Sequence, residues 1–333
     1  MTTHANNFSV DIIIPSHNRA GFICQALDSI LWQTIKPARA IVIDDGSTDN
    51  TRNLVASYLP LFQQKGIVLS YIFQNKRGVS SARNLGIAHS TSAYILFLDS
   101  DDMIRPTYIS EFMKFYSNNP ADIAYTSLEI IDDKGNVVKN HPELKDFENH
   151  QQNIFNDLLR DNLFIRNAAQ VLFPRRIIAN GLRFDESLTY AEDLDFLLKI
   201  AANNSFVFLN NELFLYRLHA SNVCRDKTYV FRESIRFYKL WIDRGAGQSI
   251  TNLWGKYLLY RIILRFPHLD FYKIADASLA DLKYKMALFP RFSGNIIWNS
   301  VWSFADYAWR SIVTGSFVKD VRRYIYTRKK YFK

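Results

Sequence analysis

The chain has few of the features that anchor or crosslink proteins. Its 333 residues include only two cysteines, Cys24 and Cys224. We expect neither to belong to a disulfide framework or a zinc site, and the chain fits a reducing compartment. No run of 18 or more apolar residues occurs, so we expect no helix that spans a membrane. The first residues, MTTHANNFS, lack the basic and then apolar pattern of a signal peptide, and we expect none.

Common cofactor motifs are also missing. IPSHNRAG, rather than GxGxxG, follows the first apolar run, which argues against a dinucleotide-binding dehydrogenase. Neither a GxxxxGK phosphate loop nor an HExxH zinc pattern is present. The composition is 48% hydrophobic and 15% aromatic, which is enough to build a sizeable core, so we expect a folded protein.

The net charge of +9 is unevenly distributed along the chain. Residues 1–224 hold 20 Lys and Arg against 24 Asp and Glu, a balance of −4. Residues 225–333 hold 21 against 8, a balance of +13. We therefore expect a slightly acidic body over residues 1–224 and a basic, aromatic-rich helical region over residues 225–333.

Short β-branched runs alternate with helical patterns in the first hundred residues. The expected strands cover residues 10–15, 39–44, 67–73 and 93–99, and the expected helices cover residues 23–31, 48–64 and 80–90. This alternation with short connections predicts an α/β fold with a mostly parallel sheet flanked by helices. Further along, residues 132–165 are expected to form a loop with a turn at DDKGN (132–136), and residues 191–201 an amphipathic helix.

Each expected strand ends in polar residues, and ligands of parallel sheets gather at the carboxyl ends of strands. The richest of these ends is DSDD (99–102), whose carboxylates suit a hard cation such as Mg²⁺ or Mn²⁺. A solvated acidic turn is the plainer alternative. A phosphatase with an aspartate nucleophile is disfavoured, because that motif usually follows the first strand and wants Thr or Val where Met103 stands.

Two other polar strand ends have both a structural and a functional interpretation. DDGSTDN (44–50) contains good helix N-cap residues, but capping does not explain both Asp44 and Asp45, which could accept from a uracil N–H or a ribose hydroxyl. The segment around Arg83 and Asn84 forms either an ordinary surface helix or part of a nucleotide site.

The last two candidates lie far along the chain. Glu192 and Asp193 fall in the first turn of an expected helix, where negative charge is favourable with or without a catalytic role. His219, in YRLHASN, is either a packed or surface histidine or a ligand.

Four segments, in their order and spacing, resemble family 2 of the inverting nucleotide-sugar glycosyltransferases, which have the GT-A fold. The resemblance covers roughly residues 8–220. It is carried by IIIPSHNRAGFICQALDSILWQT (12–34), VIDDGSTDNT (42–51), NKRGVSSARNLGIAHSTSAYILFLDSDD (75–102) and FDESLTYAEDLDFLLKIA (184–201). The resemblance implies a GT-A catalytic domain over residues 1–224, with a nucleotide-sugar half at about 8–104 and an acceptor half at about 105–224.

The resemblance also implies roles for individual residues. Asp193 would be the general base, with Glu192 as the second candidate. Asp101 would hold Mn²⁺ or Mg²⁺ on the diphosphate, with Asp102 as an alternative ligand. The residues implied to bind the nucleotide sugar are Pro15, Asn18, Asp45, Arg83 and Asp99. Those implied to contact the acceptor or the diphosphate are Tyr190, Tyr216 and His219.

The expected activity is transfer of a sugar, with inversion, from a UDP-sugar or a similar donor to a hydroxyl of a glycan or lipid-linked saccharide. Bacterial capsule or lipopolysaccharide synthesis is the expected setting. Two alternatives remain: a non-catalytic nucleotide-sugar binder, and a sugar nucleotidyltransferase, whose early Gly- and Lys-rich loop the chain lacks.

The basic region at residues 225–333 has three interpretations. Aromatic residues mixed with Lys and Arg favour an anionic membrane surface, which would place the protein peripherally at the inner face of the cytoplasmic membrane. A solvated helical face or an oligomer interface is the second interpretation. Nucleic-acid binding is the third, and we do not expect it, because no binding motif accompanies the charge.

Overall fold

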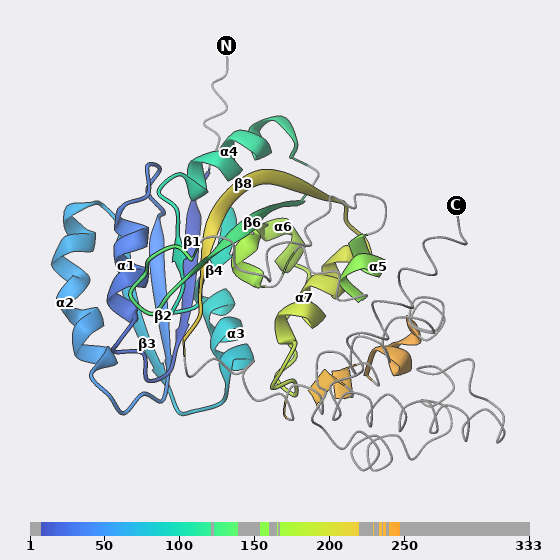
Figure 1. The fold of residues 1–333 in the computed structure, drawn as a ribbon, viewed down its shortest axis with the longest axis horizontal. Helices are drawn as coiled ribbons and strands as arrows, with labels where there is room; N and C mark the ends of the chain where they lie inside the picture. The colour runs from blue at the N-terminus through green and yellow to red at the C-terminus, as the bar shows by residue number, and fades with distance from the viewer. Residues whose placement is uncertain are drawn as a thin grey trace, which may run out of the picture. The chain divides into compact units, whose positions relative to one another are not determined.

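The computed structural model describes residues 8–120, 123–138, 154–159, 165, 167–219 and 240–246, together with a few single positions between 229 and 237. The chain divides into two compact units, Met1–Arg225 and Asp226–Lys333. Nearly all described residues belong to the first unit (Figure 1). In the second unit a short helical turn spans Ile242–Ala246, and most of the predicted basic region lies outside the described residues.

A five-stranded sheet forms the centre of the first unit (Figure 1). Its order is β3-β2-β1-β4-β7, with β1–β4 parallel and β7 antiparallel to β4. The strands are β1 (Val10–Ser16), β2 (Arg39–Asp45), β3 (Val68–Gln74), β4 (Tyr94–Phe97) and β7 (Phe173–Pro174). Ile13 of β1 lies opposite Ile41 of β2 and Phe97 of β4, so the carboxyl ends of the parallel strands meet at one edge. The predicted mostly parallel sheet is confirmed.

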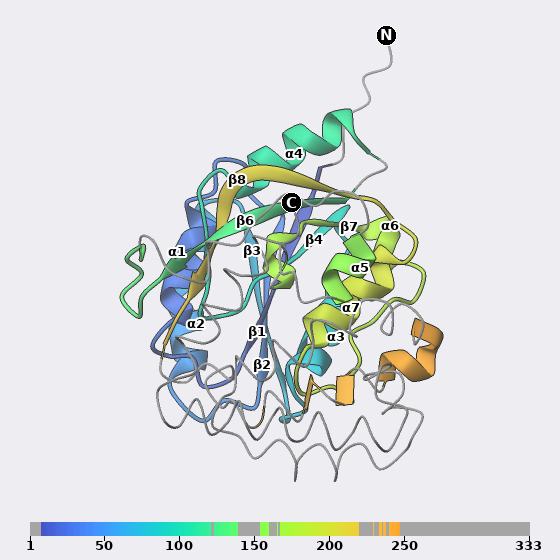
Figure 2. The same ribbon diagram turned by 45° about the vertical axis from the view of Figure 1, so that its right-hand side comes forward.

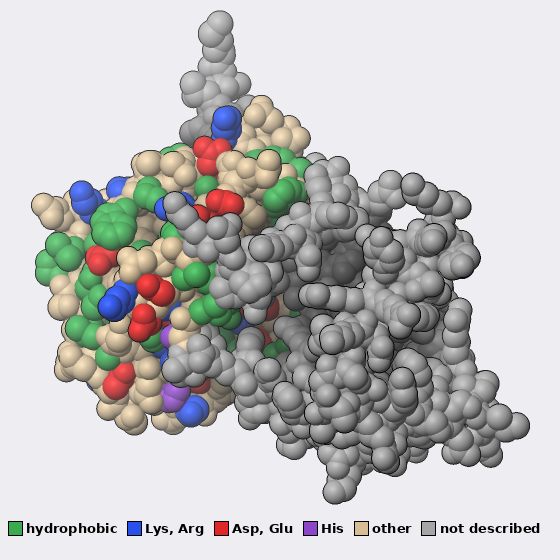
Figure 3. All heavy atoms as spheres, in the orientation of Figure 1, with side chains coloured by type: hydrophobic (Ala, Val, Ile, Leu, Met, Phe, Trp, Pro, Cys, Tyr) green, Lys and Arg blue, Asp and Glu red, His purple; other side chains and the backbone are tan. Residues whose placement is uncertain are grey.

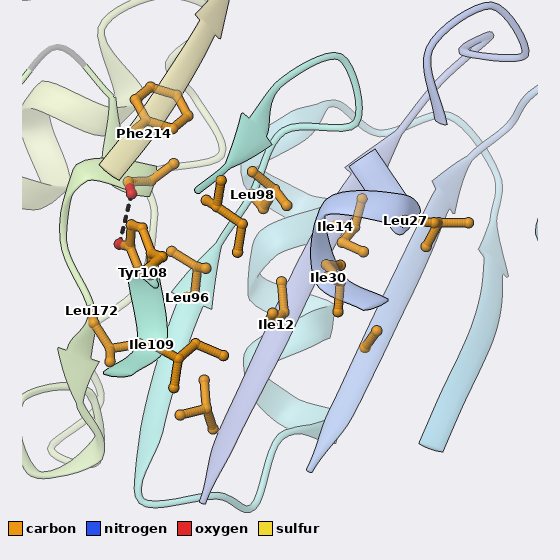
Figure 4. Packing of buried hydrophobic residues seen from close by; sticks show 14 of the residues in the cluster. Ile12, Ile14, Leu27, Ile30, Leu96, Leu98, Tyr108, Ile109, Leu172 and Phe214 are labelled. Carbon is orange, nitrogen blue, oxygen red and sulfur yellow. Dashed lines mark hydrogen bonds between the residues drawn. The ribbon is translucent and has the colours of Figure 1, made fainter. Parts of the chain in front are cut away.

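The central strands are buried on both faces, as their continuous apolar sequence indicates. Three helices connect them: α1 (Ile23–Leu31), α2 (Thr51–Gln64) and α3 (Val79–His89). Ile12 and Ile14 of β1 pack in one cluster with Leu27 and Ile30 of α1 (Figure 4). Because side chains alternate along a strand, Ile13 points to the opposite face, where it meets α3.

A second, three-stranded sheet has the order β5-β8-β6, with β5 at Met103–Ile104, β6 at Ile123–Ile131 and β8 at Phe206–Arg217. Pairing of Met103 with Leu215 brings the end of β8 beside the segment that follows DSDD. The remaining helices are α4 (Tyr108–Asn118), α5 (Ile154–Leu159), a 3₁₀ turn (Ala168–Gln170), α6 (Arg175–Ile178) and α7 (Glu192–Ala201). Of these, α5 and α7 contact each other (Figure 2). The Tyr108 hydroxyl donates to the Ala169 carbonyl at 2.7 Å, which ties α4 to the 3₁₀ turn (Figure 4).

The sequence predictions for this region are partly confirmed and partly wrong. The turn at residues 132–136 is present, since the Asp132 N–H donates to the Asn136 carbonyl at 2.9 Å. The prediction of a loop throughout residues 132–165 is wrong, because α5 lies within it. This six-residue helix is too short to form through propensity alone, and it contacts α7. None of the helices in the described part of the chain is long and apolar enough to cross a bilayer.

The close approach of α3 to β1 predicts that Gly86 tolerates no side chain. A Cβ at this position would lie 2.3 Å from Ile13 Cγ2. We expect Gly86→Ala to lower the free energy of unfolding by about 1–3 kcal/mol, through forced repacking of the sheet face. The measurement is the urea midpoint of purified protein. Gly21→Ala is the matched control, since a Cβ there meets no atom within 4 Å. Equal midpoints for the two variants would contradict the packing argument.

Candidate functional site

The loops after β1 and β2 are fastened to each other at the carboxyl edge of the sheet. Asn18 has a left-handed backbone, with φ of 51°. Its side-chain oxygen accepts the N–H groups of Thr48 (2.8 Å) and Asp49 (3.3 Å), and its own N–H donates to Ser47 Oγ at 2.9 Å. Asn18 therefore shapes the predicted nucleoside pocket by fixing the two loops that border it.

Asp45 is buried, and its carboxylate accepts hydrogen bonds from the end of β3 and the loop that follows it. Its Oδ1 accepts from Gln74 Nε2 and from the Arg77 N–H, both at 2.7 Å, and its Oδ2 accepts from the Gly78 N–H at 2.8 Å. Gly78 has φ of 97°, a conformation that favours glycine, and it precedes α3 directly. The carboxylate of Asp45 thus fixes the conformation of the turn from which α3 begins.

Arg83 of α3 is buried within a cluster of three carboxylates. Its Nη2 lies 2.8 Å from Asp99 Oδ1, and its Nη1 lies 3.0 Å from Glu192 Oε1 and 2.7 Å from Asp193 Oδ1. Burial opposes the charged form of Arg83, but the charges of Asp193, Asp99 and Glu192 outweigh this and raise its pKa. The structure therefore brings together four predicted site residues from three separate segments.

Asp193 has the environment of a carboxylate that exchanges protons near neutral pH. Its Oδ2 accepts from the Ala168 N–H at 3.3 Å, while its buried Oδ1 is held in the ion pair with Arg83 at 2.7 Å. Burial raises the pKa of Asp193 to about 7, because the lowering effect of Arg83 only partly offsets it and the charges of Glu192 and Asp99 add to it. A left-handed residue, Ala191, with φ of 59°, turns the chain so that α7 begins beside the cluster.

Oxygen atoms of Asp99, Asp101 and Asp102 all lie within 4.8 Å of one another. Asp101 Oδ2 lies 3.0 Å from His219 Nε2 and 3.2 Å from Arg19 Nε. Although burial raises the pKa of Asp101, the hydrogen bond from His219 and the charge of Arg19 bring it below the ordinary value. Carboxylate oxygens gathered in this way could hold Mg²⁺ or Mn²⁺.

Asp102 differs from its neighbour because it is almost completely buried. Its Oδ1 accepts the Arg217 N–H at 2.8 Å. Burial, followed by the charges of Asp101 and Asp99, raises the pKa of Asp102 well above its ordinary value. Asp101 is therefore the better placed of the two predicted metal ligands, and Asp102 connects the acidic loop to β8.

Sequence reasoning missed Asn167, which links the two ends of the site. Its Nδ2 donates to Asp99 Oδ2 at 3.0 Å, and its Oδ1 accepts the Ala169 N–H at 2.7 Å. The next residue, Ala168, donates to Asp193. One turn therefore positions both Asp99 and Asp193. Asn is a common capping residue, but nothing in the sequence around it indicates these partners.

Arg217 was also missed, although it anchors the acidic loop from β8. Its buried guanidinium donates to the carbonyls of Asp101 (2.5 Å) and Asp132 (2.8 Å) and to Gln25 Oε1 (2.8 Å). Its partners are mostly backbone oxygens of loops distant in sequence, which no spacing rule identifies.

The other predicted residues have varied surroundings. Pro15 is buried within β1, and Tyr216 packs against the hydrophobic core. Tyr190 is half-buried two residues before α7. His219 is buried and stacks on Phe22, with ring centroids 4.8 Å apart. His219 also contacts the aspartate cluster, because its Nε2 lies 3.0 Å from Asp101 Oδ2.

The negative balance of the first unit is not concentrated in one patch on the face shown in Figure 3. Acidic and basic side chains are interspersed there with hydrophobic ones. The aspartates of DSDD are concentrated at the sheet edge instead.

Known proteins resemble the chain in both sequence and fold. The model of glycosyl transferase family 2 matches residues 11–181. An uncharacterized glycosyltransferase of Rickettsia typhi is 30% identical over 253 residues, 74% of this chain and 75% of that protein. One from Rickettsia conorii is 29% identical over 220 residues, which are 64% of this chain but only 33% of that longer protein. The structure of residues 1–349 of Staphylococcus aureus TarS in complex with UDP-GlcNAc is 18% identical, has a TM-score of 0.61, and is matched over 85% of this chain and 82% of that one.

The chain belongs to glycosyl transferase family 2, since the family model matches more than half of it. Its central sheet flanked by helices is the GT-A fold that the sequence predicted. The family match ends before α7, so the assignment of a role to Asp193 depends on geometry.

We expect the protein to lose much of its stability when Arg83, the guanidinium of the buried cluster, is replaced. In Arg83→Met three carboxylates lose their shared counter-ion, and we expect the free energy of unfolding to fall by about 3–5 kcal/mol. The loss should shrink as the pH falls through about 7, because Asp193 then becomes protonated and uncharged.

Denaturant unfolding at pH 6 and pH 8 measures this effect. Arg77→Met is the control: Arg77 pairs with Glu186 at 3.1 Å, but its side chain is 64% exposed, so about 1 kcal/mol or less is expected. Equal losses for the two variants would contradict the assignment of Arg83 as the counter-ion.

Proposed function

We propose that the first unit transfers a sugar, with inversion, from a nucleoside-diphosphate donor such as a UDP-sugar to a hydroxyl of a glycan or lipid-linked saccharide. The observation that carries the proposal is the shared cluster around Arg83. It holds Asp99, beside the candidate metal ligands, in the same ionic group as Asp193, whose Oδ1 lies 2.7 Å from Arg83 Nη1 and whose pKa burial raises to about 7. Family membership and the UDP-GlcNAc bound to TarS support the choice of donor class.

At the donor end, Asp101 would hold Mn²⁺ or Mg²⁺ together with Asp99 or Asp102, which offer oxygen donors within 4.8 Å. When bound, such an ion supplies Lewis-acid stabilisation of the negative charge on the departing diphosphate. Asn167 holds one oxygen of Asp99 and Arg83 holds the other, so this carboxylate keeps a fixed orientation.

At the acceptor end, Asp193 would take the proton of the attacking hydroxyl. A sugar hydroxyl is a poor nucleophile, and a positioned carboxylate with a pKa near the working pH is an effective base. Glu192 is the second candidate. Arg83 Nη1 contacts both Glu192 Oε1 (3.0 Å) and Asp193 Oδ1 (2.7 Å), so the preference for Asp193 comes from its raised pKa. Attack opposite the leaving diphosphate in one displacement inverts the anomeric centre, as in inverting hydrolases.

The loops of Asn18 and Asp45, with buried Pro15, would form the nucleoside side of the pocket, and Tyr190, Tyr216 and His219 the acceptor or diphosphate side. The basic region at residues 225–333 would bring the protein to an anionic membrane surface, where lipid-linked acceptors of surface polysaccharide synthesis reside. This part of the proposal lies mostly outside the described residues.

Nucleotide binding tests the donor site. We expect calorimetric titration with UDP, GDP, dTDP and CMP to show Mn²⁺-dependent binding of one nucleotide, UDP being the candidate. Asp101→Asn should weaken it at least about tenfold, because a charged metal ligand is lost. Asp133→Asn is the matched control, because this exposed Asp lies in the turn at residues 132–136 and not in the aspartate cluster. Failure of a folded wild-type sample to bind any of the nucleotides would contradict the proposal.

The pH dependence of transfer tests the base. Only ionised Asp193 accepts a proton, so we expect the rate to rise with pH through about 7 and then to level off. Asp193→Asn should lower kcat by about 10²–10⁴-fold with unchanged UDP affinity, and should remove the dependence on pH near 7. Glu192→Gln should keep that dependence. The opposite result for the two variants would assign the base to Glu192 instead.

A further inference from the structure

Arg19 reaches the aspartate cluster from a rigid stretch of main chain. Its backbone N–H donates to Thr51 Oγ1 at 3.0 Å, and the next N–H, of Ala20, donates to Asp49 Oδ2 at 3.0 Å. From this fixed origin the guanidinium extends to Asp101, with Nε 3.2 Å from Oδ2. The main chain is therefore held in place, whereas the long side chain makes one ion pair with the described residues.

Two other arginines and a histidine around the cluster are held much more firmly. The side chain of Arg83 is 2% exposed and has three carboxylate partners, and that of Arg217 is buried among carbonyl oxygens. His219 is 4% exposed and stacks on Phe22. The side chain of Arg19 is 29% exposed. Among these groups, Arg19 has the most freedom to change partner.

The negative charge of the aspartate cluster explains why Arg19 would change partner when a metal ion binds. Carboxylates this close repel one another, and in this arrangement Arg19 supplies positive charge to Asp101. A cation bound by Asp101 supplies the same charge, so the ion pair with Arg19 competes with it. A guanidinium released beside a nucleoside diphosphate is suited to bind its oxygens, because its donors match phosphate in pairs.

We propose that Arg19 is an exchangeable cation of the donor site, which pairs with Asp101 in the donor-free protein and with the diphosphate when donor and metal are bound. The inference rests on the proposed function. It makes Arg19 a diphosphate-binding residue, a role to which neither the sequence nor the family match assigned it.

The test uses Arg19→Gln in the full chain and two binding measurements. Mn²⁺ alone, titrated by electron paramagnetic resonance, should bind about two- to fivefold more tightly to the variant, since a competing ion pair is gone. UDP with saturating Mn²⁺ should bind about tenfold or more weakly, because charge-assisted hydrogen bonds are lost. Uridine, which has no phosphate, should bind the variant and the wild type equally. Arg52→Gln, an exposed arginine of α2, is the charge-matched control and should change none of these affinities.

Each other outcome has a definite meaning. Unchanged Mn²⁺ affinity in Arg19→Gln would overturn the competition with Asp101. Equal weakening of UDP and uridine would show a general disturbance of the pocket and overturn the role at the diphosphate. If the wild-type protein binds Mn²⁺ but no UDP, the exchange of Arg19 is overturned as well. In that case the proposed function itself has failed, and the variant would differ from the wild type only in its affinity for Mn²⁺.

Discussion

The ion cluster around Arg83 is the interaction on which the arrangement of the site depends. A guanidinium with 2% of its side chain exposed is stable inside a protein only if opposite charges compensate for lost water. Asp99, Glu192 and Asp193 supply those charges from the loop after β4 and from the start of α7. The same contacts that satisfy the buried charge therefore fix the distance between Asp99 and Asp193, the proposed donor and acceptor ends of the site.

Several of the polar residues at the sheet edge hold the surrounding loops in place. Asn18 and Asp45 accept backbone N–H groups from neighbouring loops, and Asp102 accepts from β8. Such bonds satisfy buried donors and leave the loops in defined positions. The groups that we propose for the chemistry are Asp101, which pairs with Arg19, and Asp193, which pairs with Arg83.

Local patterns predicted the parts of the fold whose signals are local. The apolar runs of β1–β4 and the acidic start of α7 were located to within a few residues. The loop predicted for residues 132–165 was wrong, because α5 is too short for a periodic signal and packs on α7. Asn167 and Arg217 were missed because their partners are carboxylates and carbonyls from distant segments, which only the folded chain brings within hydrogen-bonding distance.

The sequence by itself determined the parallel sheet, the polar strand ends and the identity of the carboxylates, because strand periodicity and turn chemistry act over a few residues. Only the tertiary structure decided what each carboxylate does. Asp45 and Asp102 are engaged in backbone hydrogen bonds, whereas burial raises the pKa of Asp193 to about 7 and the fold places it against Arg83. Desolvation and charge pairing depend on what surrounds a group in space, and those surroundings come from residues far apart in the chain.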